Sequence, residues 1–249
     1  MRDRRPLLVL GAVTAAIACA PTPAPDRSST AGDEATPAPA VDDRRCKPAP
    51  GTSGAPKTID EAIALANGLP FPVTAECFVE ALDRPLQIEA TKSERSLQKA
   101  VGARSPRVFI WGADTLVMSI VLDGDGRDLI EFGQFITPKR SIKAELKFPL
   151  AAPVTAKTAY DRVRNPEHPN ITVCFVCHDR EKDVPELPGA RSSLALRPRP
   201  STIVAVDSLR AEYESCDRAA EPARCAYLEA LMSHGPVEHR AFDEELRVF

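Results

Sequence analysis

The sequence predicts an α+β fold: an antiparallel β-meander or open barrel with short flanking helices, followed by a smaller, mainly helical C-terminal segment. Three observations lead to this prediction. Apolar and polar residues alternate with the period of a strand through much of residues 86–150. Apolar residues recur at helical spacing before and after that stretch. Short turns separate the last four expected strands, which is typical of an antiparallel meander and not of a parallel sheet.

The N-terminus predicts export and a lipid anchor. Residues 1–5 carry three arginines, and residues 7–18 form an uncharged, mostly apolar run that is too short to span a bilayer. This combination is typical of a signal peptide, which we place at residues 1–18. The sequence Ala-Ile-Ala-Cys that ends at Cys19 resembles the lipobox of bacterial lipoproteins, so Cys19 is expected to carry a lipid. The alternative is ordinary cleavage beside a free cysteine.

A disordered tether is expected between this anchor and the folded body. Residues 19–56 are rich in Pro, Ala, Ser, Thr and Asp and hold almost no large apolar side chain, so they cannot bury a core. Removing residues 1–18 takes away three of the 32 basic and one of the 35 acidic residues, which leaves a formal charge of −5. A mildly acidic surface argues against nucleic acid as a partner. Because a signal peptide and a lipid on Cys19 are predicted, we expect the protein at a bacterial membrane, facing the periplasm or the cell exterior.

A β-rich domain is expected over residues 57–153, and it opens with two short helices. Thr58 and Glu61 stand at the spacing of a capping box, and apolar residues recur at helical spacing until Gly68 ends the first helix. A second helix is predicted at residues 74–82. Strands are expected at residues 86–91, 107–111, 116–122, 129–136 and 141–148.

The last of these strands shows the alternation most clearly. Ile142, Ala144 and Leu146 alternate with charged residues, which predicts one apolar and one charged face. The strands at residues 107–111 and 116–122 are apolar almost throughout. Such strands are typically covered on both faces.

Residues 154–249 are expected to form the smaller, mainly helical segment. A short helix is predicted at residues 155–163, and the prolines of residues 165–170 separate it from the next part of the chain. The remaining elements are a strand at residues 202–206 and helices at residues 208–214 and 223–234.

Beyond Cys19, the chain contains six cysteines, as is typical of an exported protein with disulfides. They fall into three neighbouring pairs: Cys46 with Cys77, Cys174 with Cys177, and Cys216 with Cys225. If Cys174 and Cys177 hold a cofactor, the other four cysteines can form two disulfides with none left over. A third disulfide between Cys174 and Cys177 fits the count equally well.

Residues 174–178 read Cys-Phe-Val-Cys-His, a C-x-x-C-H motif that is typical of c-type haem attachment. Cys174 and Cys177 can form thioethers with the two vinyl groups of one haem, and His178 is then the proximal iron ligand. A redox dithiol would normally lie in a βαβ pattern, which is not evident here, and a zinc site would need further Cys or His at ligand spacing. We therefore expect one covalent haem c, with a Cys174–Cys177 disulfide as the main alternative.

The second iron ligand is sought among the remaining methionines and histidines. The candidates are Met118, His168, Met232, His234 and His239. Met232 and His234 follow His178 by a little over fifty residues, a separation similar to that of the late methionine in small c-type cytochromes. Met232 also lies on the apolar face of a predicted helix, and His234 stands at the end of that helix, so both have structural explanations. The sixth position is alternatively empty or filled by water.

The signal peptide, the spacer and residues 174–178 together resemble bacterial exported lipoproteins that carry a single cytochrome c haem motif. A β-rich body followed by C-x-x-C-H is also similar to small cytochromes that crosslink haem to a lysine and oxidise hydroxylamine, although the sequence singles out no such lysine. The resemblance implies a membrane-tethered protein with one haem. Electron transfer with a redox partner protein is the expected function.

Two other functions stay open: a haem enzyme with an open iron site, and a lipid-anchored binding or structural domain in which Cys174 and Cys177 form a disulfide. An electron-transfer haem needs only an edge near the surface and a tuned potential, whereas an enzyme needs an open iron position with polar groups beside it. The sequence shows no nucleophile elbow, phosphate loop or other catalytic constellation. An electron carrier is therefore favoured over an enzyme.

Overall fold

The computed structural model of the chain describes residues 43–249. The predictions of a signal peptide at residues 1–18 and of lipidation at Cys19, and most of the predicted spacer at residues 19–56, fall outside this range. Within it, no helix has both the length and the apolar character needed to cross a bilayer.

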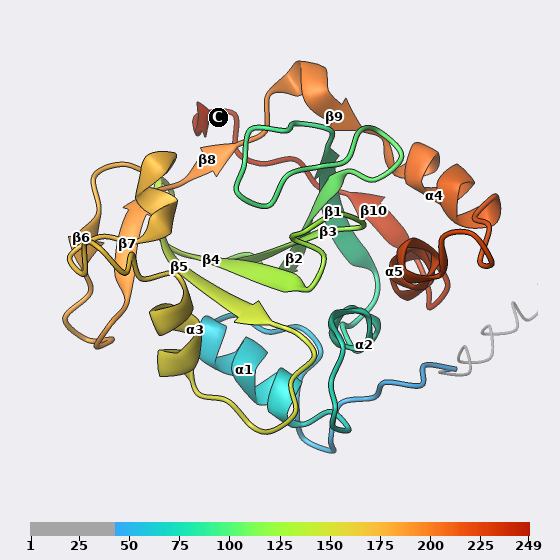
Figure 1. The fold of residues 1–249 in the computed structure, drawn as a ribbon, viewed down its shortest axis with the longest axis horizontal. Coiled ribbons are helices and arrows are strands. Elements are labelled where there is room, and N and C mark those ends of the chain that lie inside the picture. The colour runs from blue at the N-terminus through green and yellow to red at the C-terminus, as the bar shows by residue number, and fades with distance from the viewer. Residues whose placement is uncertain (1–42) are drawn as a thin grey trace, which may run out of the picture. The chain divides into compact units, whose positions relative to one another are not determined.

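The fold is α+β and is built around one mostly antiparallel sheet (Figure 1). The two ends of its strand order do not pair with each other, so the sheet stays open. The predicted antiparallel meander is confirmed. Its five strands are β1 (Leu86–Thr91), β2 (Arg107–Ala113), β3 (Leu116–Val121), β4 (Leu129–Thr137) and β5 (Arg140–Lys147), each antiparallel to the next.

The C-terminal segment is less helical than expected, because it adds short strands to both edges of the meander. β7 (Arg191–Leu194) pairs with β5, and β6 (Lys182–Asp183) pairs with β7. At the other edge, β10 (Val237–His239) runs parallel to β1, which also pairs with β9 (Ile203–Val204). Without these strands, β1 and β5 would expose a row of unpaired backbone N–H and C=O groups.

The helices lie close to their predicted positions. They are α1 (Ile59–Asn67), α2 (Ala75–Glu80), α3 (Ala156–Arg162), α4 (Val206–Glu214) and α5 (Pro222–Met232). At the start of α1, the Thr58 hydroxyl accepts a hydrogen bond from Glu61 N at 3.1 Å, which is half of the predicted capping box. The Glu61 carboxylate accepts from Lys57 N at 2.7 Å instead of from Thr58 N.

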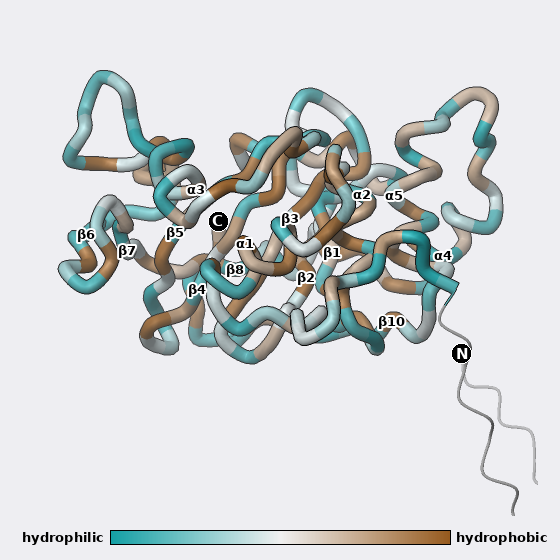
Figure 2. The backbone as a smooth tube through the Cα atoms, turned by 90° about the horizontal axis from the view of Figure 1, so that it is seen from below, coloured by the Kyte–Doolittle hydropathy of each residue, from teal (hydrophilic) through white to brown (hydrophobic). Residues whose placement is uncertain are grey.

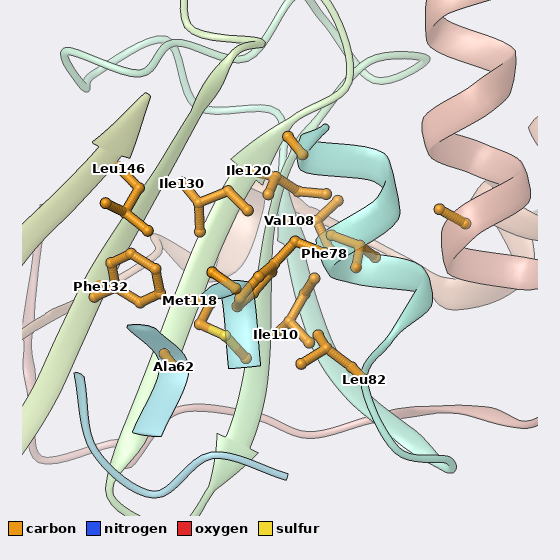
Figure 3. Packing of buried hydrophobic residues seen from close by; sticks show 14 of the residues in the cluster. Ala62, Phe78, Leu82, Val108, Ile110, Met118, Ile120, Ile130, Phe132 and Leu146 are labelled. Carbon is orange, nitrogen blue, oxygen red and sulfur yellow. The ribbon is translucent and has the colours of Figure 1, made fainter. Parts of the chain in front are cut away.

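One face of the sheet forms the main core with these helices. Alternate side chains of the central strands, among them Ile110, Met118 and Phe132, are buried there together with residues of α1 and α2 (Figure 3). Phe78 of α2 meets Phe132 edge to face, with ring centroids 6.3 Å apart. Figure 2 shows the hydrophobic residues along the central strands and hydrophilic stretches in the outer loops.

The other face of the sheet carries a smaller apolar cluster. Phe109 and Val117 are buried there against Phe242 and Leu246 from the end of the chain. The chain end is held by a separate two-stranded sheet, in which β11 (Arg247–Val248) runs parallel to β8 (Leu196–Arg197), and the C-terminus lies beside β8 (Figure 1). The central strands are thus covered on both faces, as their composition indicated.

Four of the six cysteines in residues 43–249 are paired at disulfide distance, and two are free. The structure places Cys46 and Cys77 at disulfide distance, and likewise Cys216 and Cys225, which are the pairings expected if Cys174 and Cys177 serve another purpose. Cys174 and Cys177 are both free.

Candidate functional site

The C-x-x-C-H motif forms a single tight turn. A short 3₁₀ helix spans Val173–Val176, and the Thr172 hydroxyl caps it by accepting a hydrogen bond from Cys174 N at 3.1 Å. The Cys174 carbonyl then accepts from Cys177 N at 3.1 Å and from His178 N at 2.8 Å. This turn brings both thiols and the imidazole to the wall of one pocket.

The pocket lies between this turn, the second face of the sheet and the end of the chain. Its cavity volume is about 100 Å³, below the range of about 300–1,000 Å³ that is usual for small-molecule and cofactor sites, and a wide mouth opens it to solvent. Its apolar wall includes Phe109, Val117, Phe135, Phe242 and Phe249, and its polar lining includes Arg95, Arg107, Glu131 and Lys143.

His178 has the arrangement of a metal-ligating histidine. Its Nδ1 lies 2.8 Å from the carbonyl oxygen of Leu194 in β7, and a carbonyl can only accept, so Nδ1 carries the proton. In the neutral ring, Nε2 then carries the free lone pair, and a backbone carbonyl on the other nitrogen is the usual second partner of a ligating histidine. Burial, assisted by the charge of Lys143, lowers the pKa of His178 to about 3, so the ring is neutral at physiological pH.

The two cysteines differ in exposure. Cys177 is exposed, whereas Cys174 is partly buried, and burial together with the charge of Glu131 raises the pKa of the Cys174 thiol to about 11. Both cysteines line the pocket and are free. The raised pKa keeps Cys174 in the thiol form at neutral pH.

Lys143 projects from the middle of β5 into this pocket. Burial lowers the pKa of its ammonium group to about 8, although the negative charge of Glu131 opposes that shift. Among residues 43–249, no hydrogen bond or ion pair holds its Nζ. The alternation around Ile142 assigned Lys143 to the charged face of this strand, but nothing local to the strand indicated that this face lines a pocket.

The pocket has an excess of positive charge. Its charged lining consists of three cationic side chains and one carboxylate. Arg107 forms an ion pair with Glu131 and donates a hydrogen bond to the Ser119 hydroxyl at 2.8 Å. Arg95 is exposed and, like Lys143, makes no ion pair with any other described residue. Neither Arg95 nor Lys143 thus has an ion-pair partner among residues 43–249, although the negative charge of Glu131 acts on Lys143.

The side chains at this pocket are of the types that a haem c would need, although such a group would have to extend from the small cavity into its open mouth. The porphyrin is a flat apolar group with two carboxylates at one edge, and the pocket combines aromatic walls with two unpaired cations. The motif supplies two thiols for the vinyl groups and one neutral imidazole for the iron. Cys174, Cys177 and His178 would hold the group, and Arg95 and Lys143 are available to its carboxylates.

The structure places the predicted distal ligands elsewhere. Met232 is buried in the main core with α5, and His234 Nδ1 lies 3.1 Å from an Asp43 carboxylate oxygen. Met118 is in the same core, while His168 and His239 are exposed. His178 is thus the one residue among the described methionines and histidines that lines this pocket.

No known protein family, curated protein or solved structure matches this chain. Sequence reasoning identified the three motif residues, and the structure brings these together. It did not identify Lys143, Arg95 or the aromatic wall, because these come from segments far from the motif along the chain.

Proposed function

We propose that this chain is an exported, lipid-anchored protein that binds one haem c covalently through Cys174 and Cys177, with His178 as the proximal iron ligand. The observation that carries the proposal is that two free thiols and a histidine with its Nδ1 bound to Leu194 O line one pocket. Each thioether forms when a thiol adds across a vinyl double bond. The sulfur bonds to one vinyl carbon and the hydrogen to the other, so no oxidant is consumed.

The proposed activity is electron transfer with a redox partner protein, in a domain tethered to the membrane through Cys19. Haem supplies one-electron chemistry when bound. The apolar wall around Phe109, Phe135 and Phe242 supports a tuned potential, because it excludes water from one side of the group. The exposed side of Cys177 supports access from the surface.

A second candidate is a haem enzyme or sensor with an open iron position. The placement of Met232 and His234 outside the pocket favours this candidate, because a six-coordinate carrier needs a second protein ligand at the iron. Lys143 and the Arg107–Glu131 pair would supply the polar groups that chemistry at an open iron requires.

The haem proposal is tested by expression with a c-type maturation system, followed by haem staining of a denaturing gel. The wild-type chain should keep haem through denaturation, and the double variant Cys174→Ser/Cys177→Ser should lose it. The matched control Cys216→Ser/Cys225→Ser makes the same sulfur-to-oxygen change in a pair away from the motif and should keep its haem. A wild-type chain without covalent haem, or a Cys174–Cys177 disulfide in its mass spectrum, would support the structural domain instead.

The electronic spectrum of the same sample separates the two activities. A low-spin, six-coordinate ferric iron supports the electron carrier, whereas a high-spin iron that binds added cyanide or azide supports the open site. The anchor is tested separately with Cys19→Ser. This variant should move from the membrane fraction to the supernatant of lysed cells, and an unchanged distribution would contradict lipidation at Cys19.

A further inference from the structure

We propose that Glu181 is a positioning residue for haem attachment: it holds the entry of the C-x-x-C-H turn in place through Thr172, while β7 holds both ends of the turn. The inference rests on the proposed haem binding. It assigns a role to a buried carboxylate that the motif does not contain.

The contacts of Glu181 converge on the residue that caps the motif turn. One carboxylate oxygen accepts a hydrogen bond from Thr172 N at 2.8 Å, and the other accepts from the Thr172 hydroxyl. Because the hydroxyl gives its only hydrogen to the carboxylate, its oxygen is free to accept from Cys174 N at 3.1 Å. A chain of bonds therefore runs from Glu181 through Thr172 to the first haem-binding cysteine.

Strand β7 holds this turn at two points. Arg191 at the start of β7 donates from Nε to Glu181 at 3.2 Å, which fixes the Thr172 end. Leu194 at the end of β7 accepts from His178 Nδ1 at 2.8 Å, which fixes the histidine end. β7 is itself paired with β5, the strand that carries Lys143, so the turn keeps its place relative to the pocket wall.

The Glu181 side chain is buried, so the stability of its charged form depends on its ion pair and its hydrogen bonds. Its side chain is 2% exposed, and a buried carboxylate is destabilising unless its charge and its lone pairs are satisfied. Its cationic partner Arg191 is shared with Asp183, which is exposed. Both carboxylates bind Arg191, but only Glu181 also accepts hydrogen bonds from Thr172.

This difference provides a matched pair of variants. Glu181→Gln keeps the size of the side chain but puts an NH2 donor in place of one carboxylate oxygen, so the bonds from Thr172 N and from the Thr172 hydroxyl, which go to different oxygens, cannot both be kept in this geometry. Asp183→Asn changes the other carboxylate on Arg191 and leaves Thr172 untouched. With one hydrogen bond to a charged group lost, we expect about a tenfold lower ratio of covalent haem to protein in Glu181→Gln, and an unchanged ratio in Asp183→Asn.

Spectra and rescue separate positioning from a general effect on folding. The haem that Glu181→Gln does retain should show an altered Soret band and reduction potential, because the turn that presents His178 is displaced. Thr172→Ser keeps the capping hydroxyl and should behave like the wild type, whereas Thr172→Val should behave like Glu181→Gln. The melting temperature of the haem-free form of each variant is measured alongside.

Three results would overturn the inference. One is a wild-type haem ratio and spectrum in Glu181→Gln. Another is an equal loss in Asp183→Asn, which would assign the effect to Arg191. The third is a haem loss that follows the melting temperature of the haem-free form in every variant, with Thr172→Ser losing as much haem as Thr172→Val. A wild-type chain without covalent haem would refute the proposed function itself, which distinguishes the two failures.

Discussion

On β4, the side chains of Ile130 and Phe132 lie in the main core with α2, whereas those of Glu131 and Phe135 line the pocket. β5 repeats this division, since Ile142 is buried in the core and Lys143 lies at the pocket. The two faces of one sheet therefore differ: one packs in the main core and the other lines the pocket that we propose for haem. Adjacent positions of one strand should accordingly respond to substitution in different ways.

The largest expected difference is between two phenylalanines of β4. Phe132 is 1% exposed and packs against Phe78, so Phe132→Ala should lower the free energy of unfolding by about 3–5 kcal/mol. Phe135 is half-buried at the pocket, so Phe135→Ala should cost much less. Urea denaturation of both haem-free variants measures this, and similar losses would contradict the division of the two faces.

The cysteines extend the comparison, because the two kinds of cysteine belong to different sides of the molecule. Cys77 packs against the main core and is bonded to Cys46 at a sequence separation of 31. Cys46→Ser/Cys77→Ser should lower the free energy of unfolding by about 3–4 kcal/mol through the longer unconstrained loop. Cys174→Ser/Cys177→Ser should leave the stability of the haem-free protein nearly unchanged. A large loss in this second variant would mean that the motif thiols support the fold.

Much of this division was open to prediction from the sequence. Period-two alternation by itself assigns Ile142 and Lys143 to opposite faces, and cysteine spacing suggests the pairs that the structure places at bonding distance. These features depend on neighbours along the chain. Thr172 and Glu181 also lie close in sequence, but only the buried position of the carboxylate reveals their connection.

The pocket itself was not predictable, because its walls come from distant segments. Its place depends on the pairing of β7 with β5, which brings Leu194 to His178 and faces the motif towards Lys143. The helical spacing around Met232 indicated a core position, and this is where the structure places it. Whether Met232 is a core residue or an iron ligand depends on where α5 lies relative to the motif, which the sequence does not show.

A smaller effect is expected from Lys143, and it should appear in the haem and not in the fold. Lys143→Met removes a partly buried cation without an ion pair, so the free energy of unfolding should stay level or rise slightly. A positive charge near the iron favours the ferrous form, so its removal should lower the reduction potential by tens of millivolts. Lys147→Met, at the exposed end of the same strand, is the control. An unchanged potential in Lys143→Met would place the charge away from the iron.

The smallest expected effect is a pH dependence of stability that originates on the pocket side of β1. Glu89 pairs across the sheet with Phe109, and its carboxylate accepts a hydrogen bond from Phe242 N at 2.7 Å. Burial raises the pKa of Glu89, while the bond from Phe242 and the charges of His239 and Arg197 oppose this rise. The carboxyl group is therefore harder to ionise in the folded protein than in the unfolded chain.

The sign of the effect follows from this raised pKa. Between the ordinary pKa of a glutamate and the raised value, the folded protein binds more protons than the unfolded chain, so the free energy of unfolding falls as the pH rises through that window. Glu89→Gln can still accept from Phe242 N but cannot ionise, so its free energy of unfolding should lack this slope. Glu238→Gln, which changes an exposed carboxylate on the neighbouring strand β10, should keep it. Chemical denaturation across mildly acidic to neutral pH measures the slopes, and equal slopes in wild type and Glu89→Gln would contradict the prediction, because they would show that the bond from Phe242 and the nearby charges cancel the effect of burial.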